Sequence, residues 1–556
     1  MAEIQQTRGK QPIETSMHAP LDGHANRRVR CFSYCVWLAL AGLFLVRIPL
    51  VLHRSFDADE FEHSHAAWCV FKGMVPYKDF FEHHTPWYYY TLSPFFHLFD
   101  VTTSVEGARH FLLLGRGLSF VLTALSVFLV IQLGRLWESR KVGLLAGLLL
   151  ASQPVFLEKT LEMRPDVLAL PLFIGSLWLL LRGLARSPDS TRNALPSFFG
   201  GGLALGAAIM CTQKMLFVLP GALVGLAVWS LSGATAGESC PGSKASVGAS
   251  SRLVPMLAFL IGIGVPAAST WAAFSVQGAG HEFITNNLLL NLKWKHIETH
   301  QFHRFVDTSW PILVLCLLGV TIALLRFFRL RVRRYGGILL LCTLVGLMAG
   351  AWVMPSAHGQ YYLEPLPLVC LFAAQGLLFL VERVRRPLRP VILVLALFPL
   401  AILPALALRE SFRLRNDGQL AGLRYVFENT KPDDLVMDGW QGMGVFRPHA
   451  FHYFFLHPEI VAMLPRPHLR AYLDALERGD IRPKLIAMDW NLAALGPRFQ
   501  EFVTRNYFSN DGFFYFPKGS RQARPTPGET AGARRDPSLP SGFWQQGGLL
   551  RAVRGF

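Results

Sequence analysis

Long apolar runs recur along the whole chain, and they constrain its fold more than any other feature. A helix needs about 20 mostly apolar residues to cross the hydrocarbon core of a bilayer, and about eleven runs approach that length. The chain is 52% hydrophobic and only 16% charged, which is too apolar for an ordinary soluble enzyme of this size. The sequence therefore predicts a polytopic α-helical membrane protein with runs at 31–53, 109–134, 142–157 (the shortest), 167–184, 197–213, 215–231, 253–276, 310–328, 337–354, 361–381 and 391–408.

The basic residues predict how these runs are oriented. A net charge of +17 can indicate a nucleic-acid ligand. Here, however, the Lys and Arg clusters fall in every second connection between apolar runs, which is the positive-inside pattern. The pattern predicts a cytoplasmic N-terminus, no nucleic-acid partner, and an outer location for the connection after the first run. The clusters lie at Arg27–Arg30, Arg135–Lys141, Arg182–Arg186, Arg326–Arg334 and Arg383–Arg389.

Composition divides the chain into parts. We expect a cytoplasmic tail at 1–30, a transmembrane catalytic region at 31–408 and a long first outer loop at 54–108. Residues 409–518 contain two short β-rich runs with a helix-patterned stretch between them, which predicts a small extracytoplasmic α/β domain. The Pro-, Gly- and Arg-rich segment at 519–556 has the composition of a disordered tail.

The predicted outer connections combine carboxylates, cations and aromatic residues. An acceptor hydroxyl is a weak nucleophile and needs a base such as a carboxylate to take its proton. A departing phosphate needs fixed cations, and Arg grips it better than Lys. This combination predicts sugar transfer from a lipid phosphate at the outer face of the membrane. The candidate catalytic residues are Asp57, Asp59 and Glu60, and the candidate substrate-binding residues are Tyr77, His84, Arg164, Asp166, Lys214, Arg304, His358, Tyr361 and Tyr362.

Four short motifs occur in order along these connections. Together they resemble the GT-C superfamily of membrane glycosyltransferases, and within it the group of protein O-mannosyltransferases and aminoarabinose transferases, glycosyltransferase family 39 and its relatives. The motifs are the Asp-Glu pair after the first run, "GMVPYKD" (Gly73 to Asp79) with "TP" (Thr85, Pro86), "EMRPD" (Glu162 to Asp166) and "QYYLEPLP" (Gln360 to Pro367).

The resemblance implies an inverting transfer of one sugar from a polyprenyl-phosphate donor. It also implies that the first-loop acid acts as the base or positions the acceptor, which by position falls on Asp59 with Glu60 beside it. The chain departs from the family pattern at two positions. His63 stands where an aromatic residue is common, and Thr85 stands where aminoarabinose transferases carry a Lys before the Pro. The second departure weakens the case for phosphate binding by this loop and for aminoarabinose transfer.

Simpler interpretations exist for most of these residues. The first-loop acids can cap a helix or solvate a loop, although we favour catalysis. Arg164 can pair with Asp166 instead of holding a phosphate. Lys214 can snorkel to the surface, and Arg304 can belong to a basic face that attracts anionic lipid. The tyrosines can form an aromatic belt.

A divalent metal stays open as a cofactor. His63, His65, His83 and His84 can bind one together with Glu60 or Glu82. Their spacing does not put the ligands on one face of a helix, so we favour ordinary interfacial histidines. The eight cysteines form neither a CxxC metal signature nor a disulfide framework.

Two other functions remain possible. A flippase or transporter for lipid-linked sugars would carry charged residues through the middle of its spans, and few are present. A glycan polymerase or ligase would place its arginines in a large late loop, and the connection 277–309 is a candidate. The partners expected for the favoured reading are a polyprenyl-phosphate sugar and a lipid, protein or glycan acceptor. The layout favours a bacterial inner membrane, with the endoplasmic reticulum still open.

Overall fold

The computed structural model describes residues 22–186, 191–232, 249–294, 300–329, 335–354 and 357–520. The first 21 residues of the predicted cytoplasmic tail and the predicted disordered tail from residue 521 onward lie outside the described residues. The small polar loop around 233–248 does as well.

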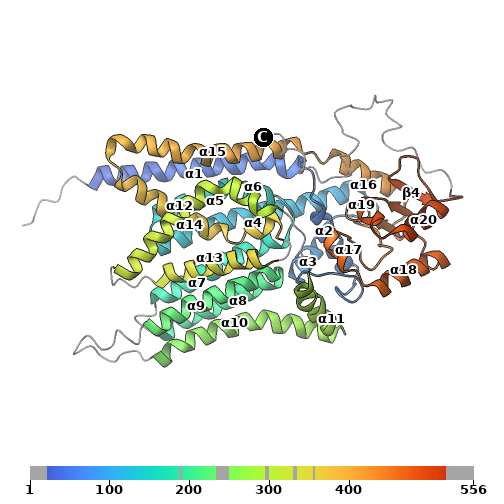
Figure 1. The fold of residues 1–556 in the computed structure, drawn as a ribbon, viewed down its shortest axis with the longest axis horizontal. Helices are drawn as coiled ribbons and strands as arrows, with labels where there is room; N and C mark the ends of the chain where they lie inside the picture. The colour runs from blue at the N-terminus through green and yellow to red at the C-terminus, as the bar shows by residue number, and fades with distance from the viewer. Residues whose placement is uncertain are drawn as a thin grey trace, which may run out of the picture.

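Long helices lie side by side and form an elongated bundle that makes up most of the molecule (Figure 1). All eleven predicted runs fall on helices of this bundle. Within the described residues, nine helices are long and apolar enough to cross a membrane, by length and composition. The bundle helices that carry the predicted runs, including two that are not among these nine, are α1 (Asp22–His53), α4 (Val105–Trp137), α5 (Arg140–Ser152), α7 (Pro165–Arg186), α8 (Thr191–Cys211), α9 (Val218–Ser232), α10 (Ala249–Val276), α12 (Gln301–Arg329), α13 (Tyr335–Val353), α14 (Leu366–Arg383) and α15 (Arg389–Arg413).

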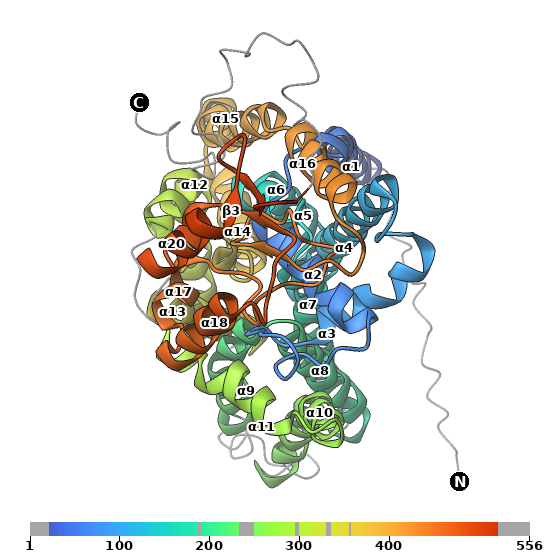
Figure 2. The ribbon, with the colours of Figure 1, turned by 90° about the vertical axis from the view of Figure 1, so that its right-hand side faces the viewer.

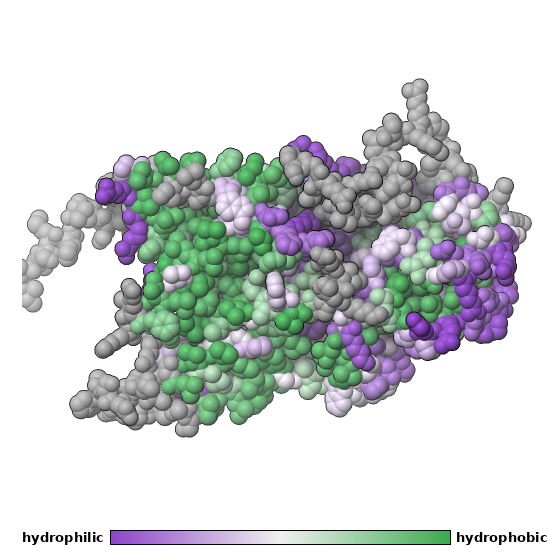
Figure 3. Space-filling view, in the orientation of Figure 1, coloured by the Kyte–Doolittle hydropathy of each residue, from purple (hydrophilic) through white to green (hydrophobic). Residues whose placement is uncertain are grey.

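Two of the predicted runs are not among the nine candidate spans. The run 142–157 falls on α5 and the short helix α6 (Pro154–Lys159), and α5 has only 13 residues. At 1.5 Å per residue such a helix covers about 20 Å, less than the hydrocarbon core of about 30 Å. The run 391–408 falls on α15, which is also outside the nine. The apolar surface of the bundle forms a broad band between two hydrophilic ends (Figure 3).

Small residues let the helices of the bundle approach closely. A Cβ atom on Gly134 of α4 would lie 2.6 Å from the Cα of Gly143 in α5. A Cβ atom on Gly202 of α8 would lie 2.1 Å from the carbonyl oxygen of Phe259 in α10. Backbone contact at small residues is a common way for membrane helices to pack, because lipid supplies no hydrophobic drive between them.

The first outer loop folds into short elements at one end of the bundle. Asp57 caps α2 in a reciprocal capping box with Glu60, in which each side chain accepts from a backbone N–H. Most of α2 is buried, so the helix has packing partners on more than one side. The elements are α2 (Ala58–Phe71), α3 (Trp87–Leu92) and the 3₁₀ helix η1 (Ser93–Leu98).

Later connections also form short elements. These are η2 (Gln213–Phe217), α11 (Gly280–Ile284), η3 (Thr285–Leu289), η4 (Asn291–Lys293), η5 (Gly359–Tyr362) and η6 (Arg386–Leu388).

The C-terminal region forms a small unit with a four-stranded sheet of order β1-β2-β4-β3. β1 and β2 are parallel, and the other two pairs are antiparallel. Figure 2 looks onto this unit, which lies over α2 and α3. Its elements are α16 (Asp417–Asn429), β1 (Val436–Asp438), α17 (Pro458–Met463), α18 (Arg466–Arg478), β2 (Leu485–Ala487), α19 (Trp490–Ala493), α20 (Pro497–Asn506), β3 (Tyr507–Phe508) and β4 (Phe514–Pro517).

The first outer loop and the C-terminal unit share one hydrophobic core. Phe61 and Trp68 of α2 belong to the same buried cluster as Met437 and Phe454. Backbone and amide contacts reinforce this docking, since Gln419 both donates to the Phe56 carbonyl at 2.9 Å and accepts from its N–H at 2.7 Å. The two regions therefore lie at the same end of the bundle, as their predicted common location on the outer face requires.

Candidate functional site

A cavity of about 930 Å³ lies where the helical bundle meets the first outer loop and the C-terminal unit. Its walls come from segments far apart in the sequence: α2 and the loop after it, the α6–α7 connection, η2, α12, η5 and two loops of the C-terminal unit. The residues predicted from the sequence that line it are Asp57, Asp59, His84, Arg164, Lys214, Arg304, His358 and Tyr361.

Glu60 lies outside this cavity. Its carboxylate accepts from Arg116 Nε at 2.8 Å and from Arg116 Nη2 at 2.7 Å, and both side chains are fully buried. The Met163 N–H adds a third bond at 3.0 Å. A carboxylate engaged in this way fixes α2 against α4, so the geometry does not favour Glu60 as a helper of the base.

The other three candidate substrate-binding residues also lie outside the cavity, where they contact neighbouring residues. Asp166 accepts from Lys214 Nζ at 2.5 Å and so orients this cavity lysine. Tyr77 donates to the carbonyl of His84 at 2.8 Å. The ring of Tyr362 stacks on Phe305 with centroids 4.4 Å apart. These contacts position neighbouring residues and leave the side chains themselves away from the cavity surface.

Asp57 is both a helix cap and a cavity residue. Burial disfavours its charge, but Lys159 and Arg164 overcome this penalty and hold the pKa of the carboxyl well below its ordinary value. Lys159 Nζ lies 3.4 Å from Asp57 and 3.0 Å from Glu162. Asp57 is therefore ionised at neutral pH and is a poor proton acceptor.

Arg164 is the most buried cation of the cavity. It pairs with Asp59 through one terminal nitrogen and donates to Glu162 through the other at 2.8 Å. Burial and the nearby charge of Asp57 raise the pKa of Glu162 to about 7, although the surrounding cations act in the opposite direction. The guanidinium thus lies between a carboxylate that faces the cavity and one buried behind it.

Two further cations, Lys214 and Arg304, also line the cavity. Lys214 Nζ lies 4.3 Å from the centre of the Tyr361 ring, a cation–π contact. Arg304 pairs with Glu158 at 3.0 Å. Four cations therefore converge on one cavity: Lys159, Arg164, Lys214 and Arg304.

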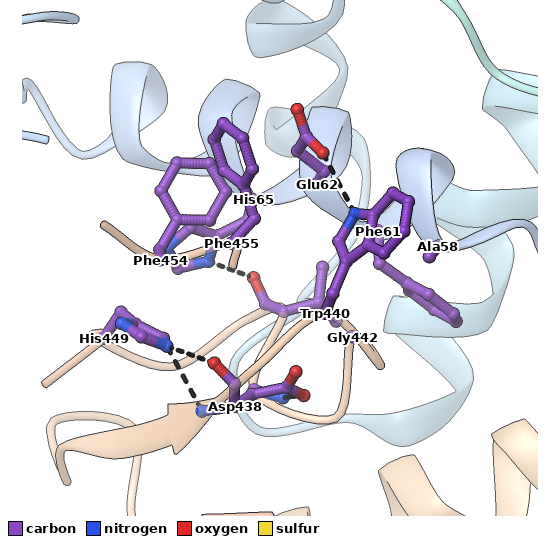
Figure 4. A pocket seen from close by; sticks show the side chains of 12 residues that line it. Ala58, Phe61, Glu62, His65, Asp438, Trp440, Gly442, His449, Phe454 and Phe455 are labelled. Atoms are coloured by element: carbon purple, nitrogen blue, oxygen red, sulfur yellow. Dashed lines mark hydrogen bonds between the residues drawn. The ribbon is translucent and has the colours of Figure 1, made fainter. Parts of the chain in front are cut away.

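The C-terminal unit contributes cavity residues that the sequence did not identify. Trp440 Nε1 donates to Glu62 Oε2 at 3.1 Å, as Figure 4 shows. Glu459 bonds to His358 Nε2 at 3.0 Å and to His457 Nδ1 at 2.9 Å. Burial disfavours the charge of Glu459, but these two histidines lower its pKa well below the ordinary value. The Trp440–Glu62 and His358–Glu459 contacts join positions 378 and 101 residues apart, so no local pattern predicts them.

A second cavity, of about 310 Å³, lies between α2 and the C-terminal unit (Figure 4), and Glu62 and Trp440 line both cavities. Aromatic rings dominate it, and His65 lies with its ring 4.5 Å from that of Phe454. Burial lowers the pKa of His65 to about 3, and its Nδ1 bonds to the Val445 carbonyl at 2.8 Å. This cavity is part of the packing between α2 and the C-terminal unit, without the clustered cations of the first.

A group with metal-binding chemistry adjoins the larger cavity. Glu62, Glu82, His83 and His84 each bring one potential ligand atom within 4.8 Å of the others. Helical periodicity does not apply to this group, because Glu82, His83 and His84 lie in an irregular loop, outside any helix.

Comparisons with known proteins agree with this architecture. Residues 83–260 match the family described as dolichyl-phosphate-mannose-protein mannosyltransferase. No curated protein is similar to the chain in sequence.

Three solved structures share the fold. ArnT from Cupriavidus metallidurans, solved bound to undecaprenyl phosphate, has a TM-score of 0.57 at 13% identity and covers 90% of this chain and 100% of its own. The Archaeoglobus fulgidus oligosaccharyltransferase tethered with an acceptor peptide has a TM-score of 0.52 at 12% identity, covering 89% and 75%. AglB from Archaeoglobus fulgidus, in complex with an inhibitory peptide and a dolichol-phosphate, has a TM-score of 0.51 at 13% identity, covering 87% and 74%.

The helical bundle and the C-terminal sheet match what the sequence predicted. The family match over residues 83–260 and the shared fold support the resemblance to the GT-C superfamily of membrane glycosyltransferases.

Proposed function

We propose that the chain transfers one sugar from a polyprenyl-phosphate donor to an acceptor hydroxyl at the extracytoplasmic face of the membrane. The observation that carries this proposal is the cavity itself, in which the carboxylate of Asp59 and four cations meet at the end of the helical bundle. Relatives of the fold support the donor class, since ArnT was solved with undecaprenyl phosphate and AglB with a dolichol-phosphate.

In the proposed reaction Asp59 takes the proton of the acceptor hydroxyl. The oxygen attacks the anomeric carbon from the face opposite the phosphate, the bond from this carbon to the phosphate oxygen breaks, and the polyprenyl phosphate leaves with the electron pair. One substitution at the carbon inverts its configuration. Asp57 is a poor base because Lys159 and Arg164 hold its pKa well below the ordinary value, so we assign the role to the other cavity aspartate, Asp59.

The phosphate would bind to Arg164, Lys214 and Arg304, with Lys159 as an additional cation. Fixed cations stabilise the charge that develops on the leaving group and need no reorganisation during the reaction. Arg164 pairs with Asp59 in the structure. A donor phosphate would compete for this guanidinium, so donor binding would loosen the pair and free Asp59 to accept a proton.

Transfer of a preassembled glycan is the second candidate, because two of the structural relatives are oligosaccharyltransferases. The share of each relative's length that this chain covers favours transfer of a single sugar. The chain covers all of ArnT but only three quarters of the archaeal enzymes. The mass added to the acceptor separates the two.

Transfer by the full-length chain in detergent tests the proposal. Radiolabelled polyprenyl-phosphate sugars are offered as donors, with membrane extract as the source of acceptor. We expect wild type to move label to acceptor and Asp59→Asn to lose at least ~100-fold, the scale of a lost general base. Glu106→Gln, an exposed acid outside the cavity, is the matched control and retains full transfer.

Two outcomes would count against the proposal. If folded Asp59→Asn protein transferred label as fast as wild type, Asp59 would not be the base. If wild type transferred no labelled sugar to any acceptor but carried labelled lipid across the membrane of proteoliposomes, the chain would be a transporter and not a transferase.

A further inference from the structure

Four side chains from two segments converge beside the larger cavity. Glu62 lies on α2, and Glu82, His83 and His84 lie on the loop before α3. Glu82 is fully buried, and Glu62 and His83 are 5% and 8% exposed. His84 is half-buried and opens toward the cavity. The group is therefore enclosed on the protein side and accessible from the cavity side.

Several of the polar atoms in this group lack a hydrogen-bond partner within the described residues. Glu62 Oε2 accepts from Trp440, which fixes the carboxylate, but Glu62 Oε1 has no such partner. His83 Nδ1 is also buried without one. An unpaired buried polar atom costs about 1–3 kcal/mol, so native proteins rarely leave several together unless a ligand satisfies them.

Two of the four residues in the group are buried carboxylates. Within the described residues, the partners recorded for Glu82 at ion-pair distance are the rings of His83 and His84. Both histidines line the cavity and Glu62 lies against it. A bound cation would neutralise the two carboxylates.

The distances suit ligands that share one ion. His83 Nδ1 lies 3.6 Å from Glu82 Oε1, and His84 Nδ1 lies 3.8 Å from Glu62 Oε1. These two separations are too long for hydrogen bonds, whereas His84 Nδ1 lies at hydrogen-bond distance, 2.9 Å, from Glu82 Oε1. Two ligands of a tetrahedral zinc, each bonded at about 2.0–2.1 Å, lie about 3.4 Å apart. Small side-chain adjustments therefore bring all four atoms to ligand distance.

We propose that Glu62, Glu82, His83 and His84 form a binding site for one divalent transition-metal ion, with zinc as the best fit. Imidazole nitrogens favour zinc over magnesium and calcium, which prefer sites made only of oxygen ligands. The site goes beyond the proposed transfer reaction, because the binding of the ion is measurable without any donor or acceptor. It would join α2 to the loop before α3, and Trp440 would hold Glu62 in place as a ligand.

Metal content and thermal stability of the full-length chain test the site. Tag-free protein in detergent is stripped with a chelator and dialysed against zinc, and bound metal is counted by mass spectrometry. We expect one zinc per chain, a rise in Tm on adding zinc, and no rise on adding magnesium. Cobalt in place of zinc gives visible absorption bands that report its ligand geometry.

Variants separate this site from incidental zinc binding. Changes to the residues that support metal ligands typically weaken metal affinity 10- to 100-fold, and loss of a ligand itself is expected to cost at least as much. We expect at least ~10-fold weaker binding in Glu82→Gln and in His84→Gln. His110→Gln, an exposed histidine outside the group, retains wild-type binding.

If Glu82→Gln fails to fold, the half-buried His84 gives the deciding variant. Stoichiometric zinc binding that survives His84→Gln and Glu62→Gln unchanged would overturn the proposal, and so would stripped wild-type protein that takes up no zinc. Neither result bears on whether Asp59 is the base, so the two proposals fail independently.

Discussion

The two sides of α2 face different surroundings. Asp59 faces the larger cavity, with its converging cations, whereas Phe61 and His65 face the smaller cavity and the aromatic rings of the C-terminal unit. Glu62 lines both cavities. Charged groups that recognise a substrate must stay accessible to it, but a docking surface gains stability by excluding water. The difference teaches that one short helix serves both as a wall of the site and as the joint with the C-terminal unit.

Breaking the buried ion pair that fixes α2 against α4 gives the largest expected effect, a loss of stability. Arg116→Met leaves the buried Glu60 carboxylate without its partner, and breaking a buried ion pair costs about 3–5 kcal/mol. We therefore expect a much lower Tm, measured by thermal unfolding in detergent. The double variant Arg116→Met/Glu60→Leu recovers part of the loss. A single variant as stable as wild type would show that the pair does not hold α2.

Removing one of the cations that line the larger cavity gives the next largest effect, on the rate of transfer. Arg164→Gln removes the guanidinium that we assign to the donor phosphate, and we expect about 100- to 1,000-fold slower transfer, the scale of one lost charge-stabilising donor. Arg164→Lys recovers part of the rate. Arg109→Gln, at an exposed arginine outside the cavity, serves as the control. Wild-type transfer by folded Arg164→Gln protein would remove this residue from the phosphate site.

The aromatic side of α2 gives a smaller effect of a different kind. Phe454 is 7% exposed and packs against His65 and Phe80. Phe454→Leu leaves a gap in this packing, and we expect a loss of about 1–2 kcal/mol in unfolding free energy. Transfer at a temperature where the protein stays folded keeps its wild-type rate. A selective loss of transfer would contradict the division of α2 into two functional sides.

The smallest effect concerns Glu162 behind the cavity. Its pKa is raised to about 7 in the folded protein, from an ordinary value of 4.5. The unfolded chain therefore releases this proton first as the pH rises, and stability falls between about pH 4.5 and 7. We expect the Tm difference between wild type and Glu162→Gln to shift against wild type over this window. A difference that does not change with pH would show that Glu162 titrates normally.

Local features predicted the bundle and part of the cavity. Apolar runs identify membrane helices because bilayer thickness sets a length that a single segment must meet. Asp59 and Arg164 were found because both stand in short motifs at predicted outer connections. The pairing of Glu60 was not predictable in the same way, since its partner Arg116 lies within an apolar run.

Other parts of the site depend on tertiary packing. Trp440 meets Glu62 across 378 positions, and only the docking of the C-terminal unit brings them together. Helical periodicity gave no information on how Glu82, His83 and His84 lie relative to one another, because the chain is irregular there. Residues on loops are positioned by the scaffold around them, which a local pattern does not encode.

The most direct test of the transfer mechanism separates donor binding from the chemical step. Donor affinity and single-turnover transfer are measured on the same preparations of wild type and Asp59→Asn. The account predicts that the variant binds the labelled polyprenyl-phosphate sugar about as well as wild type but transfers it at least ~100-fold more slowly. Equal transfer rates at equal donor occupancy would contradict the assignment of Asp59 as the base and, with it, the proposed chemistry of the cavity.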